Sequence, residues 1–344
     1  MRKYLLHVLI ISFIFLLAPT AHVATCAGEI EDAKEKVRKY PDDAIVHYNL
    51  GLAYGELGKY EEAIESYKQA IKIDPDDADA HNNLGYAYLN LGKLKKAIES
   101  YKQAIGIDPD HASAHYNLGN AYDDSGKYEE AIESYRQAIG IDPDYAWAHS
   151  NLGIAYYKSG KYEEAIESYK QAIRIDPDFA MAHSNLGNTY GDSGKYEEAI
   201  ESFKQAIKID PDFAMAHSSL GLAYSDLGKH EEAIESFKQA IKIDPDYADA
   251  HDNLGCTYNL LGKYKEAIES HKQAIRLDPD DASNAHYNLA CCYSLLGNVS
   301  KALKSLGKAI DLGFDDIKHI ENDSDLNGLR DEAGYKKLIN KLKS

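Results

Sequence analysis

Eight histidines recur along the chain at a nearly constant interval, and imidazole nitrogens are common metal ligands. Successive histidines lie 34 residues apart, or 35 before the last one. Two ligands of one ion must both lie within the ~2 Å bond length of the metal, and this interval places the histidines in separate segments. We therefore expect histidines that are packed and hydrogen-bonded within pairs of helices, with no shared metal. They are His47, His81, His115, His149, His183, His217, His251 and His286.

The tripeptide Asp-Pro-Asp recurs at the same interval, and its carboxylates raise the question of calcium. The spacing lacks the glycine and the distal glutamate of an EF-hand loop, so calcium is not favoured. Proline instead stops a helix, and aspartate is a preferred N-cap. We expect Pro109 to end one helix and Asp110 to cap the next. The tripeptide begins at Asp74, Asp108, Asp142, Asp176, Asp210, Asp244 and Asp278.

The segment 78–111, "ADAHNNLGYAYLNLGKLKKAIESYKQAIGIDPDH", contains the elements that lie between two such tripeptides. Leu84 and Tyr88 share one face at helical spacing in its first half, as Ile98 and Tyr101 do in its second half. Both halves therefore predict amphipathic helices, and Gly92 is typical of a helix C-terminus. A fixed period of this length predicts a stack of repeats.

The segment resembles the tetratricopeptide repeat, which also has 34 residues and two helices. The resemblance rests on "NLGYAY", Gly92, Ala97, Tyr101, Ala104 and Pro109, and it covers most of the chain. It implies an all-α fold, a right-handed α-solenoid of helix-turn-helix repeats. Eight copies can be aligned, at 44–77, 78–111, 112–145, 146–179, 180–213, 214–247, 248–281 and 283–316.

The flanking segments are expected to cover the open ends of this stack, because terminal units must hide an exposed core. Residues 29–43 resemble a second helix alone, with Ile30, Ala33 and Val37 on its covering face. Residues 317–344 are expected to form short C-terminal capping helices. Glycine at the eighth position of each repeat, such as Gly85, is expected to permit a close approach of helices near Ala97.

The resemblance further implies that the first helix of each repeat lines a concave groove. The sixth position of each repeat faces that groove and is usually asparagine, whose amide can pair with the backbone of an extended peptide. Such a ladder is similar to the one in the repeat region of O-GlcNAc transferases. Asparagine is also family consensus here, so a purely structural role is the alternative. The residues are Asn49, Asn83, Asn117, Asn151, Asn185, Asn253 and Asn288, with Ser219 in the sixth repeat.

Aromatic and acidic residues are expected beside these asparagines. The net charge of −18 argues against a nucleic-acid surface and favours a neutral or basic protein or peptide partner. The carboxylate clamp of the family needs basic residues on this face, and only Lys158 comes near, so acidic chaperone tails are not expected. The groove residues are Tyr48, Tyr86, Tyr116, Tyr157, Asp124, Asp192 and Asp226, joined by Glu56, Asp123, Trp147, Asp252 and Tyr287.

The first 28 residues have the layout of a secretory signal peptide: Arg2 and Lys3, an apolar run, and then small residues. The apolar run is shorter than the ~20 residues that span a bilayer, so an uncleaved anchor is the less favoured alternative. "VATC" makes lipidation at Cys26 a minority alternative. Cys256, Cys291 and Cys292 are expected to be free thiols, and no Cys/His metal spacing is present.

No motif of a catalytic site occurs, and no segment outside the repeats is long enough for a catalytic domain. The sequence therefore predicts a non-enzymatic scaffold without cofactors that binds an extended peptide. It is expected to be exported, periplasmic, secreted or membrane-anchored, and to act in envelope, pilus or polysaccharide-export assembly. The alternative is a membrane-tethered regulatory subunit of a separate catalytic chain.

Overall fold

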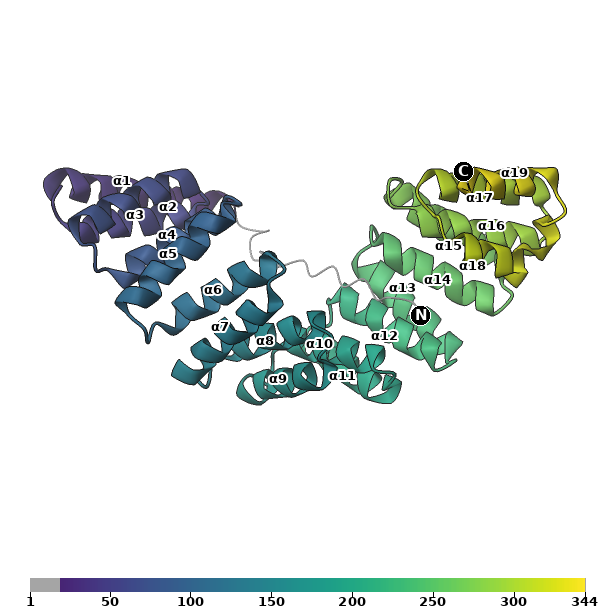
Figure 1. The fold of residues 1–344 in the computed structure, drawn as a ribbon, viewed down its shortest axis with the longest axis horizontal. Coiled ribbons are helices and arrows are strands. Elements are labelled where there is room, and N and C mark those ends of the chain that lie inside the picture. The colour runs from purple at the N-terminus through teal and green to yellow at the C-terminus, as the bar shows by residue number, and fades with distance from the viewer. Residues whose placement is uncertain (1–18, 344) are drawn as a thin grey trace. The chain divides into compact units, whose positions relative to one another are not determined.

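The computed structural model describes residues 19–343, with side chains from Gly28 onward (Figure 1). Every regular element in this part is helical, which confirms the predicted all-α solenoid of stacked helix pairs. The helices are α1 (Pro19–Lys39), α2 (Ala44–Glu56), α3 (Tyr60–Ile73), α4 (Ala78–Asn90), α5 (Leu94–Ile107), α6 (Ala112–Asp124), α7 (Tyr128–Ile141), α8 (Ala146–Lys158), α9 (Tyr162–Ile175), α10 (Ala180–Asp192), α11 (Tyr196–Ile209), α12 (Ala214–Asp226), α13 (His230–Ile243), α14 (Ala248–Leu260), α15 (Tyr264–Leu277), α16 (Ser283–Leu295), α17 (Val299–Asp311), α18 (Ile317–Asn322), the 3₁₀ helix η1 (Ser324–Leu329) and α19 (Ala333–Lys343).

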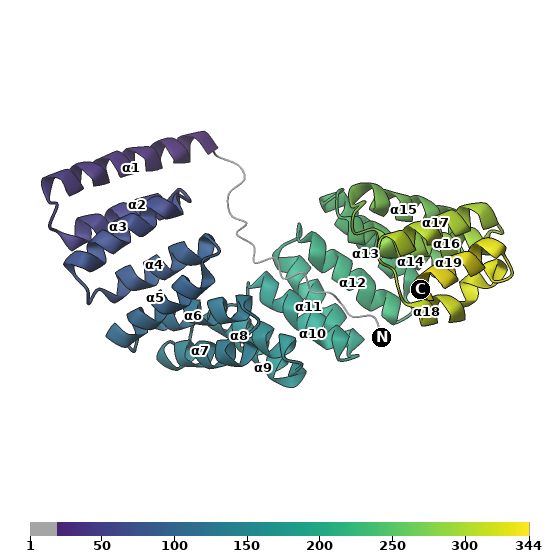
Figure 2. The same cartoon turned by 45° about the horizontal axis from the view of Figure 1, so that its top comes forward.

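The chain divides into two compact units. Unit 1 extends to Pro177, and unit 2 begins at Asp178. In both units, the two helices of each repeat pack against each other, and the second packs against the first helix of the next repeat (Figure 2). The first helices of neighbouring repeats also touch: α2 with α4, α4 with α6 and α6 with α8 in unit 1, and α10, α12, α14 and α16 in the same way in unit 2.

A left-handed glycine ends the first helix of each pair. Gly126, for example, has φ 73° between α6 and α7, a conformation that glycine adopts without steric cost. The sequence prediction at Gly92, with φ 67°, is confirmed in the same way. These glycines set the tight turn that folds each second helix back onto the first.

The glycine at the eighth position was expected to permit a close approach of helices. It lies against an aromatic ring on the second helix of the same repeat. A β-carbon on Gly85 would lie 2.7 Å from Cε1 of Tyr101 and one on Gly187 would lie 2.7 Å from Cε1 of Phe203. The ring therefore occupies the space that a side chain would need. In the last pair, Ala290 replaces the glycine and Leu306 replaces the ring, and both are fully buried.

The Asp-Pro-Asp turns differ in detail from the prediction. Asp110 does not cap α6: its own N–H donates to Oδ1 of Asp108 at 3.1 Å, and the N-cap is His111. The carboxylate of the first aspartate thus closes a local turn, which draws the second one away from the helix end. The same bond joins Asp76 to Asp74, Asp144 to Asp142, Asp212 to Asp210 and Asp246 to Asp244.

Most of the repeated histidines hydrogen-bond to the proline-containing turn before their helix rather than within the helix pair. Nε2 of His115 lies 3.0 Å from the carbonyl oxygen of Pro109, so the ring donates a hydrogen bond to the turn. Each bond fastens a first helix to the turn that precedes it. The other such pairs are His47 with Pro41, His81 with Pro75, His149 with Pro143, His217 with Pro211 and His251 with Pro245.

Helix α1 covers the open side of α2. Ile30 and Ala33 are buried against Leu50, and Val37 packs beside them. The helix begins at Pro19, ten residues before the expected start at residue 29. Proline is tolerated in a first turn, and the alanines that follow favour helix. Residues 1–18 of the predicted signal peptide lie outside the described residues, and so does the side chain of Cys26.

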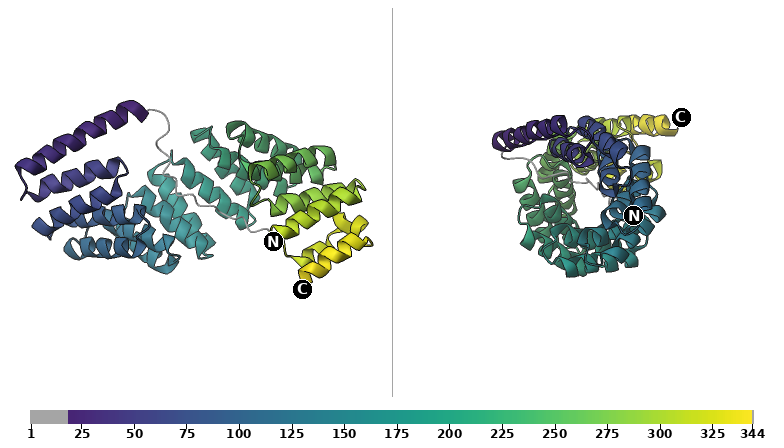
Figure 3. Two further views of the ribbon diagram at one scale, coloured as in Figure 1. Left: turned by 90° about the horizontal axis from the view of Figure 1, so that it is seen from above. Right: turned by 90° about the vertical axis from the view of Figure 1, so that its left-hand side faces the viewer.

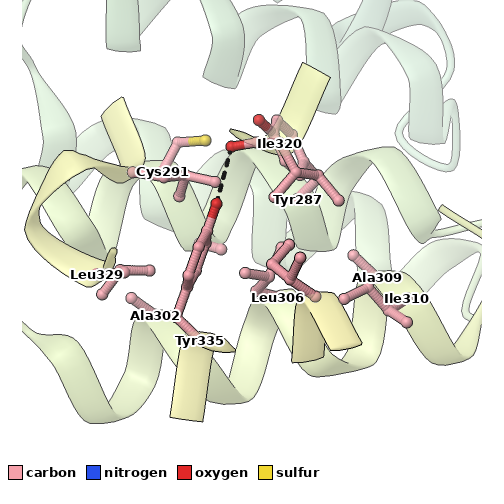
Figure 4. Packing of buried hydrophobic residues seen from close by; sticks show 12 residues of the cluster. Tyr287, Cys291, Ala302, Leu306, Ala309, Ile310, Ile320, Leu329 and Tyr335 are labelled. Atoms are coloured by element: carbon pink, nitrogen blue, oxygen red, sulfur yellow. Dashed lines mark hydrogen bonds between the residues drawn. The ribbon is translucent and has the colours of Figure 1, made fainter. Parts of the chain in front are cut away.

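Three short helices, α18, η1 and α19, cover the C-terminal end of unit 2, which is yellow in Figure 3. Ile320, Leu326 and Leu329 are completely buried against α16 and α17. The hydroxyl of Tyr335 donates to the carbonyl of Ile320 at 3.1 Å inside this core (Figure 4). Phe314, in place of the usual proline, stacks on Tyr287 with ring centroids 4.3 Å apart.

Candidate protein-binding face

Side chains from the first helices of neighbouring repeats meet on one surface, here called the first-helix face. In unit 1 it is formed by α2, α4, α6 and α8. Hydrogen bonds across it connect residues 35 positions apart, which is one residue more than the 34-residue repeat. This face contains most of the residues that the sequence predicted for binding in this unit.

Three of the predicted asparagines of unit 1 donate hydrogen bonds to side chains on the first helix of the preceding repeat. Nδ2 of Asn83 donates to the hydroxyl of Tyr48 at 2.8 Å, and Nδ2 of Asn117 donates to Oδ1 of Asn82 at 3.0 Å. Asn151 donates to the hydroxyl of Tyr116 at 3.0 Å, and to Asn120. Asn83 and Asn117 therefore each donate one hydrogen bond between repeats and Asn151 donates two, while Asn49 on α2 is exposed. The structural role raised as an alternative is thus present in unit 1.

Asn120 connects the face to the core beneath it. Its Oδ1 accepts hydrogen bonds from Nδ2 of Asn151 at 2.9 Å and from the hydroxyl of Tyr135 at 2.8 Å. The Tyr116 ring packs 4.9 Å from that of Tyr145, centroid to centroid. Burial is the main cause that raises the pKa of Tyr116 to about 12, so its hydroxyl stays protonated at neutral pH.

Two aromatic side chains on first helices of unit 1 remain half exposed. Tyr86 on α4 is 49% exposed, and Trp147 at the start of α8 is 51% exposed. The Tyr86 ring has an edge-on contact with Tyr60, 6.5 Å away. Tyr157, also predicted for the groove, is half-buried with its ring centroid 5.6 Å from that of Tyr162.

An ion pair lies at the C-terminal ends of α6 and α8. Nζ of Lys158 contacts the carboxylate of Asp123, whose side chain is only 10% exposed. Asp124 is an exposed residue, yet partial desolvation of its carboxyl, and then the charge of Asp123, raise its pKa. The only basic residue expected near this face is therefore already committed to a carboxylate.

The predicted residues of unit 2 lie on α10, α12, α14 and α16. Asn185, Asp192 and Asn253 are half-buried, and Asp226 is exposed. Nδ2 of Asn288 donates to Oδ2 of Asp252 at 3.1 Å. These residues are on the first helices of unit 2, and they form a set separate from the residues of unit 1.

Tyr287 was expected on the binding face, and the structure places it elsewhere. It is buried by the C-terminal helices, stacks on Phe314 and donates a hydrogen bond to Asp323. The physical reason is that α16 is the first helix of the final repeat, so the C-terminal helices cover the face that stays open in earlier repeats.

Cys256, Cys291 and Cys292 form no disulfide, as predicted. Burial is the main cause that raises the pKa of Cys292 to about 12, and burial also raises that of Cys291. Among the described residues, none of the helices combines the length and apolar character needed to span a bilayer.

Stacked helix pairs at a 34-residue interval, most of them with a glycine beneath a buried side chain, define a tetratricopeptide-repeat protein. Models of this repeat match residues 37–65, 55–92 and 88–126. The model for the cilia and flagella-associated protein 70 C-terminal domain matches residues 110–326, which is more than half of the chain. The chain belongs to this family of repeat domains. A comparison with curated proteins gave no match.

Solved structures with TM-scores above 0.5 share the stacked-helix fold. Cut9–Hcn1, an APC/C hetero-tetramer, is 18% identical over 77% of this chain and 54% of that chain, with a TM-score of 0.56. PilF of Pseudomonas aeruginosa is 22% identical over 59% of this chain and 92% of that chain, with a TM-score of 0.52. MamA is 32% identical over 48% of this chain and 97% of that chain, with a TM-score of 0.45.

Proposed function

We propose that this chain is an exported scaffold of eight repeats that binds an extended segment of a neutral or basic protein on its first-helix face. The observation that carries the proposal is the exposure of Tyr86 and Trp147 on first helices whose amides are already held in place. Large aromatic side chains are frequent anchors in protein interfaces. The repeat fold supports a protein-interaction scaffold, and the matched families indicate no enzyme.

The hydrogen bonds between repeats favour binding by ordering the face in advance. Asn83 and Asn117 each keep a second N–H group after donating to a neighbouring repeat. A peptide backbone could use that group without the cost of ordering the amide, because the first bond already restricts its rotation. We therefore propose a ladder in which each of these asparagines offers the peptide only its second N–H group.

The negative charge of the chain favours a basic or neutral partner over an acidic one. The net charge is −18, and Lys158 is paired with Asp123 instead of being available to an acidic ligand. Complementary charge mainly accelerates association and excludes partners of the same sign. A basic segment should therefore associate faster than an acidic one, and the difference should decrease at high salt.

Peptide binding can be tested with fluorescent peptides of matched length that carry basic, neutral or acidic residues around one apolar anchor. Tyr86→Ala and Trp147→Ala should each weaken binding of the basic peptide, by about 10-fold or more if the ring is an anchor. Tyr40→Ala is the matched control, because Tyr40 is 49% exposed in the turn after α1. Equal affinities in all three variants, or tightest binding of the acidic peptide, would contradict the proposal.

Export requires a separate test. Ile30 and Ala33 make the described contacts of α1 with Leu50, so cleavage near residues 25–28 would keep this cap. Mass spectrometry of the chain from its native host should show an N-terminus in that region. An intact Met1 in the membrane fraction would favour the tethered subunit, and an intact Met1 in the cytoplasm would contradict export.

A further inference from the structure

The repeat at 248–281 combines three side chains that no other repeat brings together. Asp252 and His271 occur in no other repeat at their positions, whereas the position of Cys256 is also a cysteine, Cys291, in the next repeat. Its second helix carries His271 where preceding repeats have a buried aromatic ring. On its first helix, Asp252 and Cys256 lie four residues apart and so share one face of α14. The rings at the position of His271 are those of Tyr67, Tyr101, Tyr135, Tyr169, Phe203 and Phe237.

These three side chains bring three kinds of ligand atom together. Nδ1 of His271 lies 2.6 Å from Oδ1 of Asp252. One candidate ligand atom from each of Asp252, Cys256 and His271 lies within 4.8 Å of the other two. A tetrahedral zinc ion with bonds of 2.0–2.3 Å needs ligand atoms about 3.5 Å apart, which small side-chain rotations would provide.

The imidazole of His271 has an unsatisfied nitrogen. The side chain is fully buried, and Nε2 has no hydrogen-bond partner among the described residues. A β-carbon on Gly255 would lie 2.7 Å from Nδ1 and 2.8 Å from Nε2, so the ring edge that carries both nitrogens faces α14. A phenylalanine, as in two other repeats, would fill this space without a buried polar atom, so packing alone does not account for the histidine.

The next repeat supplies a supporting amide. Nδ2 of Asn288 on α16 lies 3.1 Å from Oδ2 of Asp252 and 3.2 Å from Sγ of Cys256. It thereby holds the carboxylate and the sulfur on the same side as the imidazole. Outer contacts of this kind orient the ligands of metal sites.

We propose that Asp252, Cys256 and His271 bind one divalent transition-metal ion of the zinc type. Cys256 coordinates as the thiolate and releases its proton to solvent, and His271 coordinates through a neutral ring nitrogen. The fourth position is left to water. Mixed sulfur, nitrogen and oxygen donors suit zinc and disfavour magnesium and calcium, which take oxygen ligands.

The site is reachable from solvent although the histidine is buried. The Asp252 side chain is 20% exposed and Cys256 is half-buried, so the ion can enter from the first-helix face. The bound ion would link α14 directly to α15. This site is independent of the peptide binding proposed for unit 1, because all of its residues belong to unit 2.

The experiment uses untagged full-length protein, reduced and stripped of metal with a chelator, and then titrated with Co²⁺. We expect one equivalent to bind, with thiolate-to-cobalt charge-transfer absorption that Zn²⁺ abolishes by displacement. Zn²⁺ should also raise the melting temperature, because it binds the folded state alone. A wild-type titration without thiolate absorption would overturn the proposal.

Two variants borrow residues from other repeats, so they should fold. His271→Phe introduces the side chain of Phe237, and Asp252→Ser introduces that of Ser218 at the equivalent position. Each should weaken Co²⁺ binding by at least about 100-fold and keep the helical circular dichroism. Cys291→Ala is the matched control and should bind Co²⁺ as the wild type does. Unchanged Co²⁺ binding in either repeat-derived variant would overturn the proposed ligand set. Loss of the thiolate absorption in the Cys291 variant would also overturn it, because it would make Cys291 the sulfur ligand in place of Cys256.

Discussion

The ring of Tyr135 lies so close to Gly119 that a β-carbon on the glycine would be 2.6 Å from Cε1. The same relationship recurs in the preceding and following repeats. Glycine inside a helix costs about 1 kcal/mol relative to alanine, so the contact with the ring must compensate for that loss of helix stability.

Gly119→Ala should therefore destabilise the protein although alanine is the better helix former. Overpacking against the Tyr135 ring costs about 1–3 kcal/mol, which exceeds or cancels the gain in helix propensity. Gly140→Ala is the control, since Gly140 lies within α7 with no atom within 4 Å of the added β-carbon. Urea unfolding should give opposite signs for the two variants. A stabilised Gly119 variant would show that the ring moves aside freely.

Tyr101 and Tyr135 occupy equivalent positions but differ in their hydrogen bonds. The Tyr135 hydroxyl donates to Asn120, whereas the buried Tyr101 hydroxyl has no partner among the described residues. Tyr135→Phe should cost about 0.5–1.5 kcal/mol, and Tyr101→Phe should be neutral or stabilising because it removes an unsatisfied group. Thermal unfolding of both variants checks this difference. Equal losses would mean that the Tyr101 hydroxyl is hydrogen-bonded in solution.

Stability should fall as the pH rises above 10. Burial raises the pKa of Tyr116 to about 12 and also raises the pKa values of Tyr67 and Tyr101. Between the unfolded value near 10 and the folded value, the unfolded chain has released a proton that the folded chain keeps, so unfolding is favoured. Tyr116 alone should contribute on the order of 2 kcal/mol at pH 12.

Urea midpoints measured between pH 8 and pH 12 test this dependence. The decline should be shallower in Tyr116→Phe, which lacks the titrating hydroxyl, than in the wild type. A control variant at an exposed tyrosine, Tyr40→Phe, should keep the wild-type slope. A wild-type midpoint that stays constant from pH 10 to pH 12 would contradict the raised pKa values.

Lys158→Met should destabilise more than Lys161→Met. Lys158 neutralises Asp123, whose side chain is 10% exposed and whose Oδ1 has no partner among the described residues. Removing the lysine leaves that carboxylate poorly solvated, at a cost of about 1–3 kcal/mol once the partial exposure of Lys158 is considered. Lys161 faces the exposed Glu129 at 3.9 Å, where a pair contributes about 0–1 kcal/mol.

A double variant with Asp123→Asn distinguishes this cause from a general loss of packing. Neutralising Asp123 in the Lys158→Met background should recover part of the lost stability, since the uncompensated charge is gone. The same substitution in the Lys161→Met background should give no recovery. Additive losses in both backgrounds would show that the Lys158 stem matters more than its charge.

The sequence was sufficient for the fold because its signals are local and repeated. Gly92 and Pro109 mark helix ends that do not depend on distant contacts, and the 34-residue period extends them along the chain. The N-cap was mispredicted because Asp110 and His111 are both credible caps, and the choice depends on the bond from Asp110 to Asp108. Such competition between neighbouring polar groups is not visible in a residue pattern.

The candidate face was only partly predictable. The register placed Asn83, Asn117 and Asn151 on one side of their helices, but their partners depend on how neighbouring repeats are offset. The cluster at Asp252, Cys256 and His271 was missed because its members match no linear metal motif. The available signal was internal: His271 interrupts a series of aromatic residues at one repeat position.

The Gly119–Tyr135 contact lies within one repeat, whereas the Asn151–Tyr116 bond joins two repeats. Genetic duplication of a whole 34-residue unit would therefore carry the first kind of contact intact into the longer protein. The second kind would have to be re-established at each new junction, by the fifth and sixth positions of the units brought together. A change in the number of repeats therefore preserves the glycine–ring contacts, while the residues at those two positions contribute to how well two units fit as neighbours.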